Sequence, residues 1–196
     1  MFNLKKILDG VATREERTEN NLDELSRVCD TLRNLGYKIV LTQGVFDLLH
    51  IGHVRYMEKA RSKGDLLVLG VDSDELTRER KGPKRPIVPL DERLALLSRL
   101  RCVDILTVRE ASHGMDDLII KVKPDVLVVS FTTKDFPKEK WDFLEEHCGE
   151  IVRLEAQAET STSAKVRDLL LDGAQELREI IDRAIDKYFN DGDEDE

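Results

Sequence analysis

Apolar residues along the chain follow two patterns that alternate. Short continuous apolar runs predict buried strands, which we expect at residues 38–43, 66–71, 103–108, 126–129 and 151–154. Apolar residues spaced three and four apart predict helices between these runs, at residues 53–62, 91–100, 115–122 and 138–147. Apolar strands separated by helices are typical of a parallel sheet covered on both faces. We therefore expect an α/β fold with a doubly wound, Rossmann-like parallel sheet.

The two ends of the chain differ from this central alternation. Residues 1–20 are polar and mixed in charge, so we expect a loosely ordered lead-in with a short helix at residues 4–8. Helical spacing before Gly36 then predicts an N-terminal amphipathic helix through Leu22, Leu25, Val28, Leu32 and Leu35. Near the C-terminus, a helical extension is expected as two helices, at residues 163–171 and 175–189. The expected organisation is a lead-in with its helix at 1–36, the main domain at 37–172, a C-terminal helix at 173–190 and a disordered acidic tail at 191–196.

The formal net charge of −9 is concentrated at the C-terminus. Five acidic residues lie within positions 191–196, so the rest of the chain carries only −4. Such a mildly acidic body lacks the basic stripe of a nucleic-acid-binding protein, and we expect no nucleic-acid partner. A local basic pocket for phosphate groups is still compatible with this charge.

The three cysteines, Cys29, Cys102 and Cys148, are widely separated and form neither a disulfide framework nor a metal-binding spacing. This cysteine usage indicates a reducing, cytoplasmic location. No apolar run is long enough to span a bilayer, and the first residues contain no signal-peptide core. We therefore expect no membrane partner.

A segment with two histidines follows the first predicted strand. An open parallel sheet binds ligands beyond the carboxyl ends of its strands, and Gly44, at that end, lets a ligand approach the backbone. His50 and His53 flank Gly52, where the next helix is expected to begin. A helix N-terminus attracts phosphate, and two imidazoles there supply further donors. The segment therefore predicts a phosphate-binding site.

Less specific interpretations of these histidines exist. A single histidine is more often structural than catalytic, and we assign His113 and His147 to that class. A zinc site at His-x-Gly-His lacks the third protein ligand of a zinc enzyme. The position of His50 and His53 between a strand and a helix favours phosphate chemistry instead.

The sequence from Gly44 to His53, GVFDLLHIGH, resembles the GTFD-x-x-H-x-G-H signature of the cytidylyltransferase-like branch of the nucleotidyltransferase superfamily. The resemblance extends over residues 38–171, through Gly70–Thr77, Lys81–Gly82, Arg85–Arg93 and Val103–Asp104. It implies an enzyme that joins a nucleoside monophosphate from a nucleoside triphosphate to a small phosphorylated acceptor and releases pyrophosphate with Mg²⁺. It also implies a homodimer.

The resemblance implies roles for individual residues. His50 and His53 would stabilise the α-phosphate in the transition state, and Lys81 would bind phosphate from a flexible loop beside the basic Lys84 and Arg85. Nucleotide or phosphate binding is implied for Gly44, Val45, Phe46, Gly52, Asp74, Arg93, Ser161, Thr162 and Ser163. Local alternatives stay open: a solvated lysine at Lys81, a cap at Asp74, a helix-surface position at Arg93 and a plain N-cap at Thr160–Ser163.

The sequence also leaves two alternatives for the nucleobase of the triphosphate and for the acceptor. Glycerol- and choline-phosphate cytidylyltransferases carry Arg-Thr-Glu-Gly where this chain has Ala156–Glu159, which weakens a CTP assignment. Heptose-phosphate adenylyltransferases also lack that arginine and share the stretch Arg85–Arg93, but they carry Lys-Gly-Gly-Asp-Tyr where this chain has Ser130–Asp135. We expect the heptose-like branch with ATP or CTP as donor. The alternative is cytidylyl transfer to glycerol-, ethanolamine- or choline-phosphate.

Functions of other classes are compatible with parts of the sequence. A non-catalytic nucleotide-binding or regulatory protein would share the fold, but the intact pair of His50 and His53 argues against it. An aminoacyl-tRNA synthetase is disfavoured, because the chain is too short for an anticodon domain and has no basic tract. The helix at 175–189 is expected to pack on the core, with a partner chain as the alternative.

Overall fold

The computed structural model describes residues 2–114, 116–131, 141–155, 157, 169–181 and 183. The chain divides into two units, residues 1–159 and 160–196, and each is considered by itself. The predicted phosphate-binding residues Ser161, Thr162 and Ser163 lie outside the described residues. The domain boundaries expected from the sequence stay predictions.

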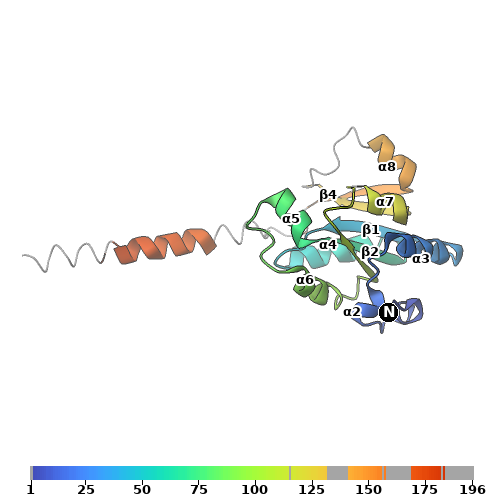
Figure 1. Cartoon of the computed structure of the whole chain (residues 1–196), viewed down its shortest axis with the longest axis horizontal. Helices are drawn as coiled ribbons and strands as arrows, with labels where there is room; N and C mark the ends of the chain where they lie inside the picture. The colour runs from blue at the N-terminus through green and yellow to red at the C-terminus, as the bar shows by residue number, and fades with distance from the viewer. Residues whose placement is uncertain are drawn as a thin grey trace, which may run out of the picture. The chain divides into compact units, whose positions relative to one another are not determined.

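The first unit is built on a parallel sheet of five strands in the order β3-β2-β1-β4-β5 (Figure 1). The strands are β1 (Ile39–Gly44), β2 (Leu66–Asp72), β3 (Ile105–Arg109), β4 (Val126–Ser130) and β5 (Glu150–Leu154). The chain moves outward from β1 to β3 and then returns to the other side of β1 with β4. The expected α/β fold is therefore confirmed, and its ligand-binding edge is expected where the strand order reverses at β1.

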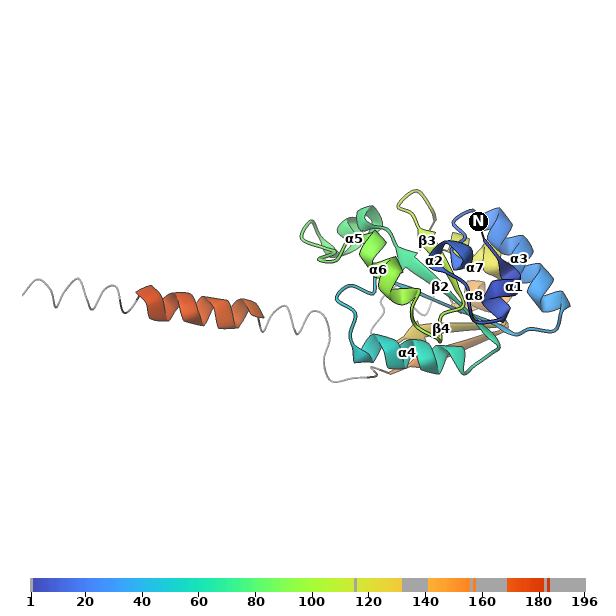
Figure 2. The same cartoon turned by 90° about the horizontal axis from the view of Figure 1, so that it is seen from below.

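Helices cover both faces of the sheet (Figure 2). On one face, α3 (Leu22–Asn34), α7 (Asp117–Val122) and α8 (Trp141–His147) contribute to one apolar cluster with Ile39 and Leu41 of β1. On the other face, α4 (Ile51–Arg61) and α6 (Leu90–Leu97) contribute to a second cluster with Val40 of the same strand. Successive strand residues point to opposite faces, so an uninterrupted apolar run supplies both clusters.

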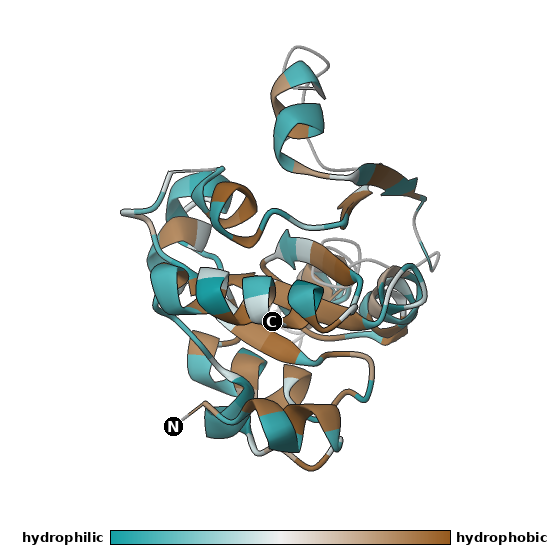
Figure 3. Ribbon diagram, turned by 90° about the vertical axis from the view of Figure 1, so that its right-hand side faces the viewer, coloured by the Kyte–Doolittle hydropathy of each residue, from teal (hydrophilic) through white to brown (hydrophobic). Residues whose placement is uncertain are grey.

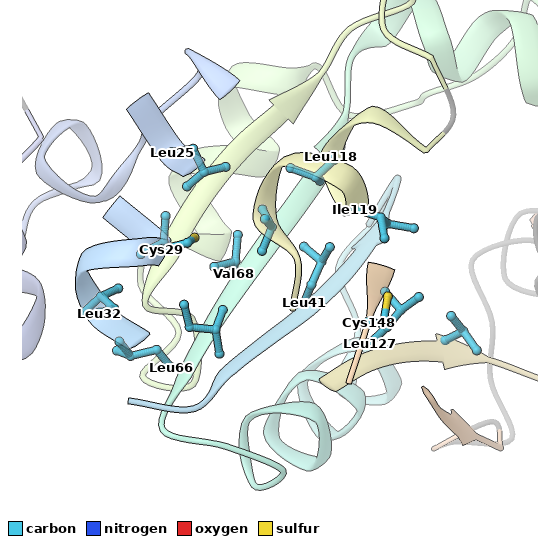
Figure 4. Packing of buried hydrophobic residues seen from close by; sticks show 14 of the residues in the cluster. Leu25, Cys29, Leu32, Leu41, Leu66, Val68, Leu118, Ile119, Leu127 and Cys148 are labelled. Carbon is cyan, nitrogen blue, oxygen red and sulfur yellow. The ribbon is translucent and has the colours of Figure 1, made fainter. Parts of the chain in front are cut away.

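The apolar clusters account for the runs seen in the sequence. The strands are mostly hydrophobic in Figure 3, and the helices carry both hydrophobic and hydrophilic residues. Figure 4 shows Leu25, Cys29 and Leu32 of α3 directed at the sheet, beside Leu118 and Ile119 of α7. All five side chains are buried. The N-terminal amphipathic helix therefore belongs to the core of this unit.

The helix at residues 74–81 was not expected from the sequence. Helix α5 (Asp74–Lys81) has the sequence DELTRERK, which contains too few apolar residues for a helical period. The one sequence feature that marks this helix is its N-cap residue, Ser73. The side chain of Ser73 accepts a hydrogen bond from the N–H of Leu76. A short helix with a polar surface can therefore be recognised in the sequence only by the capping residue at its N-terminus.

The lead-in is ordered, and the expectation of a loose segment is wrong. It contains α1 (Leu4–Leu8), as expected, and α2 (Arg14–Arg17). The buried Arg17 donates to the carbonyl of Val103 at 2.6 Å. Thr18 forms a β-bridge with Leu106 of β3, and the N–H of Glu19 donates to the carbonyl of Leu106. The lead-in therefore covers the outer edge of β3, where unpaired backbone groups would otherwise be open to other chains.

The described part of the second unit is one helix. Residues 169–181 are helical without a break at 172–174, so the expected division into two helices at this point is wrong. Its apolar side chains are exposed within this unit and include Leu169, Leu170, Leu177 and Ile180. Among the described residues, no helix is long and apolar enough to cross a membrane.

Candidate active site

The loop after β1 turns sharply at the carboxyl edge of the sheet. Phe46 and Leu48 have φ values of 53° and 44°, a left-handed conformation that costs a non-glycine residue about 1–3 kcal/mol. The turn buries Val45, Phe46 and Asp47. Such strain persists where surrounding contacts fix the backbone, so this loop is held in one shape before any ligand arrives.

The two motif histidines lie against each other. The ring centroids of His50 and His53 are 3.9 Å apart, with an angle of 26° between the ring planes. The ring of Phe46 meets the His53 ring edge-on at 5.7 Å. A side chain at Gly44 would meet the Phe46 ring at 3.4 Å, so the glycine leaves room for that ring. Gly44, Phe46, His50 and His53 thus form one packed group.

The first turn of α4 is capped by one of these histidines. Nδ1 of His50 accepts a hydrogen bond from the N–H of Gly52 at 3.1 Å, and the His50 carbonyl accepts from the N–H of His53 at 2.9 Å. A neutral ring whose Nδ1 accepts carries its proton on Nε2, which makes Nε2 a donor. Two N–H groups of this helix end are therefore used internally, which leaves fewer backbone donors for a ligand than the sequence suggests.

His53 is kept neutral by its surroundings. Burial, followed by repulsion from His50 and Lys81, lowers the pKa of His53 to about 4. Nδ1 of His53 is buried and has no hydrogen-bond partner among the described residues. A neutral imidazole donates through one nitrogen only, so His53 can donate to a phosphate oxygen without carrying charge of its own.

Asp47 fastens the histidine loop to the loop that follows α5. Its carboxylate accepts from Arg85 at 2.8 Å and from the N–H groups of Ile87 and Val88 at 3.1 Å or less. Burial opposes ionisation of Asp47, but these hydrogen bonds outweigh it and lower the pKa. No role follows from the sequence for Asp47, although an acid in an otherwise apolar segment is itself a signal of a buried partner.

Lys81 is the last residue of α5 and is exposed. Partial desolvation of its ammonium group lowers its pKa, and its charge in turn contributes to the lowered pKa of His53. Gly82 ends the helix with a φ of 93°, a conformation that favours glycine. The charge of Lys81 therefore acts on His53, whereas Arg85 of the predicted basic cluster is engaged by Asp47.

Arg93 is buried, with 1% of its surface exposed, so the alternative of a helix-surface residue is wrong. Its guanidinium donates to the carbonyls of Val45 and Asp72 and to the carboxylate of Asp74, at 2.6 to 2.9 Å. A fourth bond goes to the carbonyl of Val88 at 3.0 Å. These contacts occupy Arg93 within the protein and join the ends of β1 and β2 to the two loops of the site. Asp74 is the first residue of α5 and does not end β2.

A second buried carboxylate lies at the end of β2. Asp72 accepts from Arg80 of α5 at 2.6 Å and from Arg109 of β3 at 2.8 Å. None of these three residues was singled out by the sequence, because the register of β2 and β3 brings Asp72 to Arg109 and the unexpected helix α5 brings Arg80 to Asp72. They fix the strand ends on which the histidine pair depends.

The described residues contain no group of three or more histidine, cysteine or acidic side chains placed to hold a metal ion. The two carboxylates nearest the site, Asp47 and Asp72, are occupied by arginines. Mg²⁺ commonly keeps its waters and binds substrate phosphates with few protein ligands. The described residues therefore do not form a metal site of their own.

The chain is similar in sequence to a known protein family and to several known proteins. The family described as cytidylyltransferase-like matches residues 41–181. The bifunctional protein HldE of Desulfatibacillum aliphaticivorans is 38% identical over 148 residues, which cover 76% of this chain and 30% of the relative. HldE of Syntrophotalea carbinolica is 35% identical over 166 residues, covering 85% of this chain and 31% of the relative. The chain thus spans about a third of the length of these curated relatives.

Solved structures agree with these matches. A lipopolysaccharide core biosynthesis protein from Thermoplasma volcanium is 34% identical, with a TM-score of 0.54 over 61% of this chain and 97% of that one. Pantothenate synthetase from Thermus thermophilus is 15% identical, with a TM-score of 0.52 over 71% of this chain and 61% of that one, which shows a shared fold alone. The resemblance inferred from the histidine motif is confirmed.

Proposed function

Because the chain belongs to the cytidylyltransferase-like family, we propose that it transfers a nucleoside monophosphate from a nucleoside triphosphate to a sugar phosphate. The observation that carries this proposal is the stacked pair of His50 and His53 at the start of α4, beside Lys81. This arrangement offers hydrogen-bond donors and one cation at a single point on the ligand-binding edge of the sheet.

In the proposed reaction, a phosphate oxygen of the acceptor attacks the α-phosphorus of the triphosphate. The bond between that phosphorus and the oxygen bridging to the β-phosphate breaks, and pyrophosphate leaves with the electron pair. No residue of the chain is covalently modified. The protein contributes position and stabilisation of the negative charge that develops on the α-phosphate oxygens.

His50 and His53 donate to those oxygens in this mechanism. The internal hydrogen bond to Nδ1 of His50 fixes Nε2 as its donor, and the lowered pKa of His53 makes that ring a neutral donor at pH 7. The ammonium group of Lys81 stabilises the negative charge of the departing phosphates. Arg93 and Asp47 act as positioning residues, since their contacts are with the loops that carry these groups.

The identity of the two substrates is proposed from sequence resemblance and from one similar protein. The similar protein from Thermoplasma volcanium is a lipopolysaccharide core biosynthesis protein, and the stretch Arg85–Arg93 resembles heptose-phosphate adenylyltransferases. Both favour a sugar phosphate as acceptor and ATP as donor. The segment Gly70–Thr77 resembles the choline-phosphate branch, which keeps CTP with an alcohol phosphate as the second candidate.

Mg²⁺ is proposed as an ion that arrives bound to the triphosphate and leaves with pyrophosphate. The engaged carboxylates of Asp47 and Asp72 support this assignment, because they leave coordination to phosphate oxygens and water.

A reducing, cytoplasmic location is proposed from the cysteines. Burial raises the pKa of Cys29 and of Cys148 to about 12, so both thiols stay protonated and unreactive. A homodimer is proposed from the exposed apolar side chains of helix 169–181, and sedimentation of the full chain would measure it.

The function is tested by measuring pyrophosphate release from the four nucleoside triphosphates in combination with sugar phosphates, glycerol 3-phosphate and phosphocholine. We expect release with ATP and a sugar phosphate, and none with either substrate alone. Release only with CTP and an alcohol phosphate would favour the second candidate. A chain that binds triphosphates but releases no pyrophosphate with any acceptor would be a binding protein, and the proposal would be wrong.

A further inference from the structure

A row of paired residues crosses three strands one or two residues before their carboxyl ends. Gln43 of β1 pairs with Gly70 of β2, and Gly70 pairs with Thr107 of β3. Paired residues of neighbouring strands point to the same face. This face carries α3 and α7, and it lies on the other side of the sheet from α4.

Gln43 has an unusual environment in this row. Both polar atoms of its side-chain amide are buried and have no hydrogen-bond partner among the described residues, although the residue as a whole is only half-buried. Most buried polar groups in proteins are hydrogen-bonded, and each exception needs a reason. A buried amide without a partner destabilises the folded state, which indicates a role in binding and not in stability.

Because Gly70 has no side chain, the side chain of Gln43 has room beside it. A Cβ atom at Gly70 would lie 3.2 Å from Cβ of Gln43 and 3.3 Å from Cδ of Arg109, and it would collide with Leu118 of α7. Gln43 is thereby placed beside Arg109 and directly before Gly44 and the histidine loop. Its side chain lies on the face of the sheet opposite to α4, one residue before the end of β1.

We propose that Gln43 is the residue that recognises the acceptor, and that it selects an uncharged, hydroxyl-rich group. An amide offers both donors and an acceptor without charge, which matches the hydroxyls of a sugar or polyol phosphate. It offers neither a counter-charge nor an aromatic face to a quaternary ammonium group. This inference rests on the proposed function and narrows its acceptor class.

The variant Gln43→Leu tests this inference, because leucine nearly preserves the volume and removes both hydrogen-bonding groups. We expect the KM for the sugar phosphate to rise about tenfold, the cost of a lost hydrogen bond or two, while the KM for the triphosphate stays within about twofold. The melting temperature should stay the same or rise, since an unpaired amide is replaced by an apolar group.

The matched control is Thr107→Val, which removes from the same row a buried hydroxyl that has no partner among the described residues. Thr107 is fully buried and farther from the histidine loop, so this variant should leave both KM values unchanged. Phosphocholine replaces the sugar phosphate in a parallel assay, and the native chain should use it poorly.

The possible results separate the inference from the proposed function. An unchanged acceptor KM in Gln43→Leu, or a lower melting temperature with equal effects on both substrates, would overturn the inference alone. A native preference for phosphocholine would overturn both the inference and the proposed sugar phosphate acceptor. If the native chain neither binds sugar phosphates by calorimetry nor releases pyrophosphate with any acceptor, the inference and the proposed function both fail.

Discussion

The neutral state of His53 is the most consequential property of a single residue in this site. Burial against Phe46 and repulsion from His50 and Lys81 hold its pKa at about 4, against an ordinary value of 6.5. A protonated pair of stacked rings would repel itself, whereas a neutral His53 lets both rings approach the same phosphate. The price of this arrangement is a sensitivity of the folded state to acid.

This sensitivity can be measured. Between pH 6.5 and about 4 the unfolded chain protonates His53 and the folded chain does not, so the free energy of unfolding falls as the pH decreases through this window and the effect levels off below it. The variant His53→Asn removes the titration. Urea unfolding at pH 7 and pH 4.5 should show a smaller loss of stability in the variant than in the native chain, and equal losses would contradict the assigned pKa.

At the scale of elements, the site is an assembly of loops held by buried charges. Asp47 ties the histidine loop to the residues after α5, and Arg93 ties the same loop to β2 and to the start of α5. These bonds span 19 to 48 positions in the sequence. The loops therefore keep their relative positions only while both charged residues are in place.

The variant Asp47→Asn weakens this attachment. An amide replaces the ionised acceptor of one arginine and two N–H groups, so we expect a loss of about 1–3 kcal/mol in stability and faster tryptic cleavage after Lys84. The control Asp91→Asn disrupts the exposed pair with Arg14 and should cost less than about 1 kcal/mol. Equal effects of the two variants would show that Asp47 has no special role in holding the loop.

Much of the element structure follows from the sequence, for identifiable reasons. The strands were predicted because a strand buried on both faces must be apolar at every position, as Leu66–Asp72 is almost throughout. Helix α5 was missed because it is polar, and the roles of Asp47 and Arg93 were missed because their partners are distant in sequence. The histidine pair was found because its signature is local, with both rings within four residues.

At the scale of the whole molecule, the lead-in completes the first unit. Its charged and polar residues suggested disorder, yet they bind backbone groups of the outer strand, as Arg17 binds the carbonyl of Val103 and Glu19 that of Leu106. Contacts of this kind leave no hydrophobic pattern in the sequence. They cover an edge that a parallel sheet would otherwise present to other molecules.

Removal of residues 2–20 should therefore uncover the edge of β3. The truncated chain is expected to form larger oligomers than the full chain at equal concentration, because exposed strand edges pair with one another. Light scattering coupled to size exclusion would measure this difference. A truncated chain with the same mass distribution and melting temperature as the full chain would show that the lead-in does not protect the edge.

The central claim is that the imidazoles of His50 and His53 stabilise the α-phosphate during transfer. The most direct test is the rate of pyrophosphate release by His53→Ala, compared with His113→Ala, which removes a histidine bonded to the N–H of Glu110 after β3. The account predicts a fall in kcat of about 10²–10³-fold for His53→Ala with the melting temperature maintained, and no change for His113→Ala. A near-native rate in a folded His53→Ala variant would contradict it.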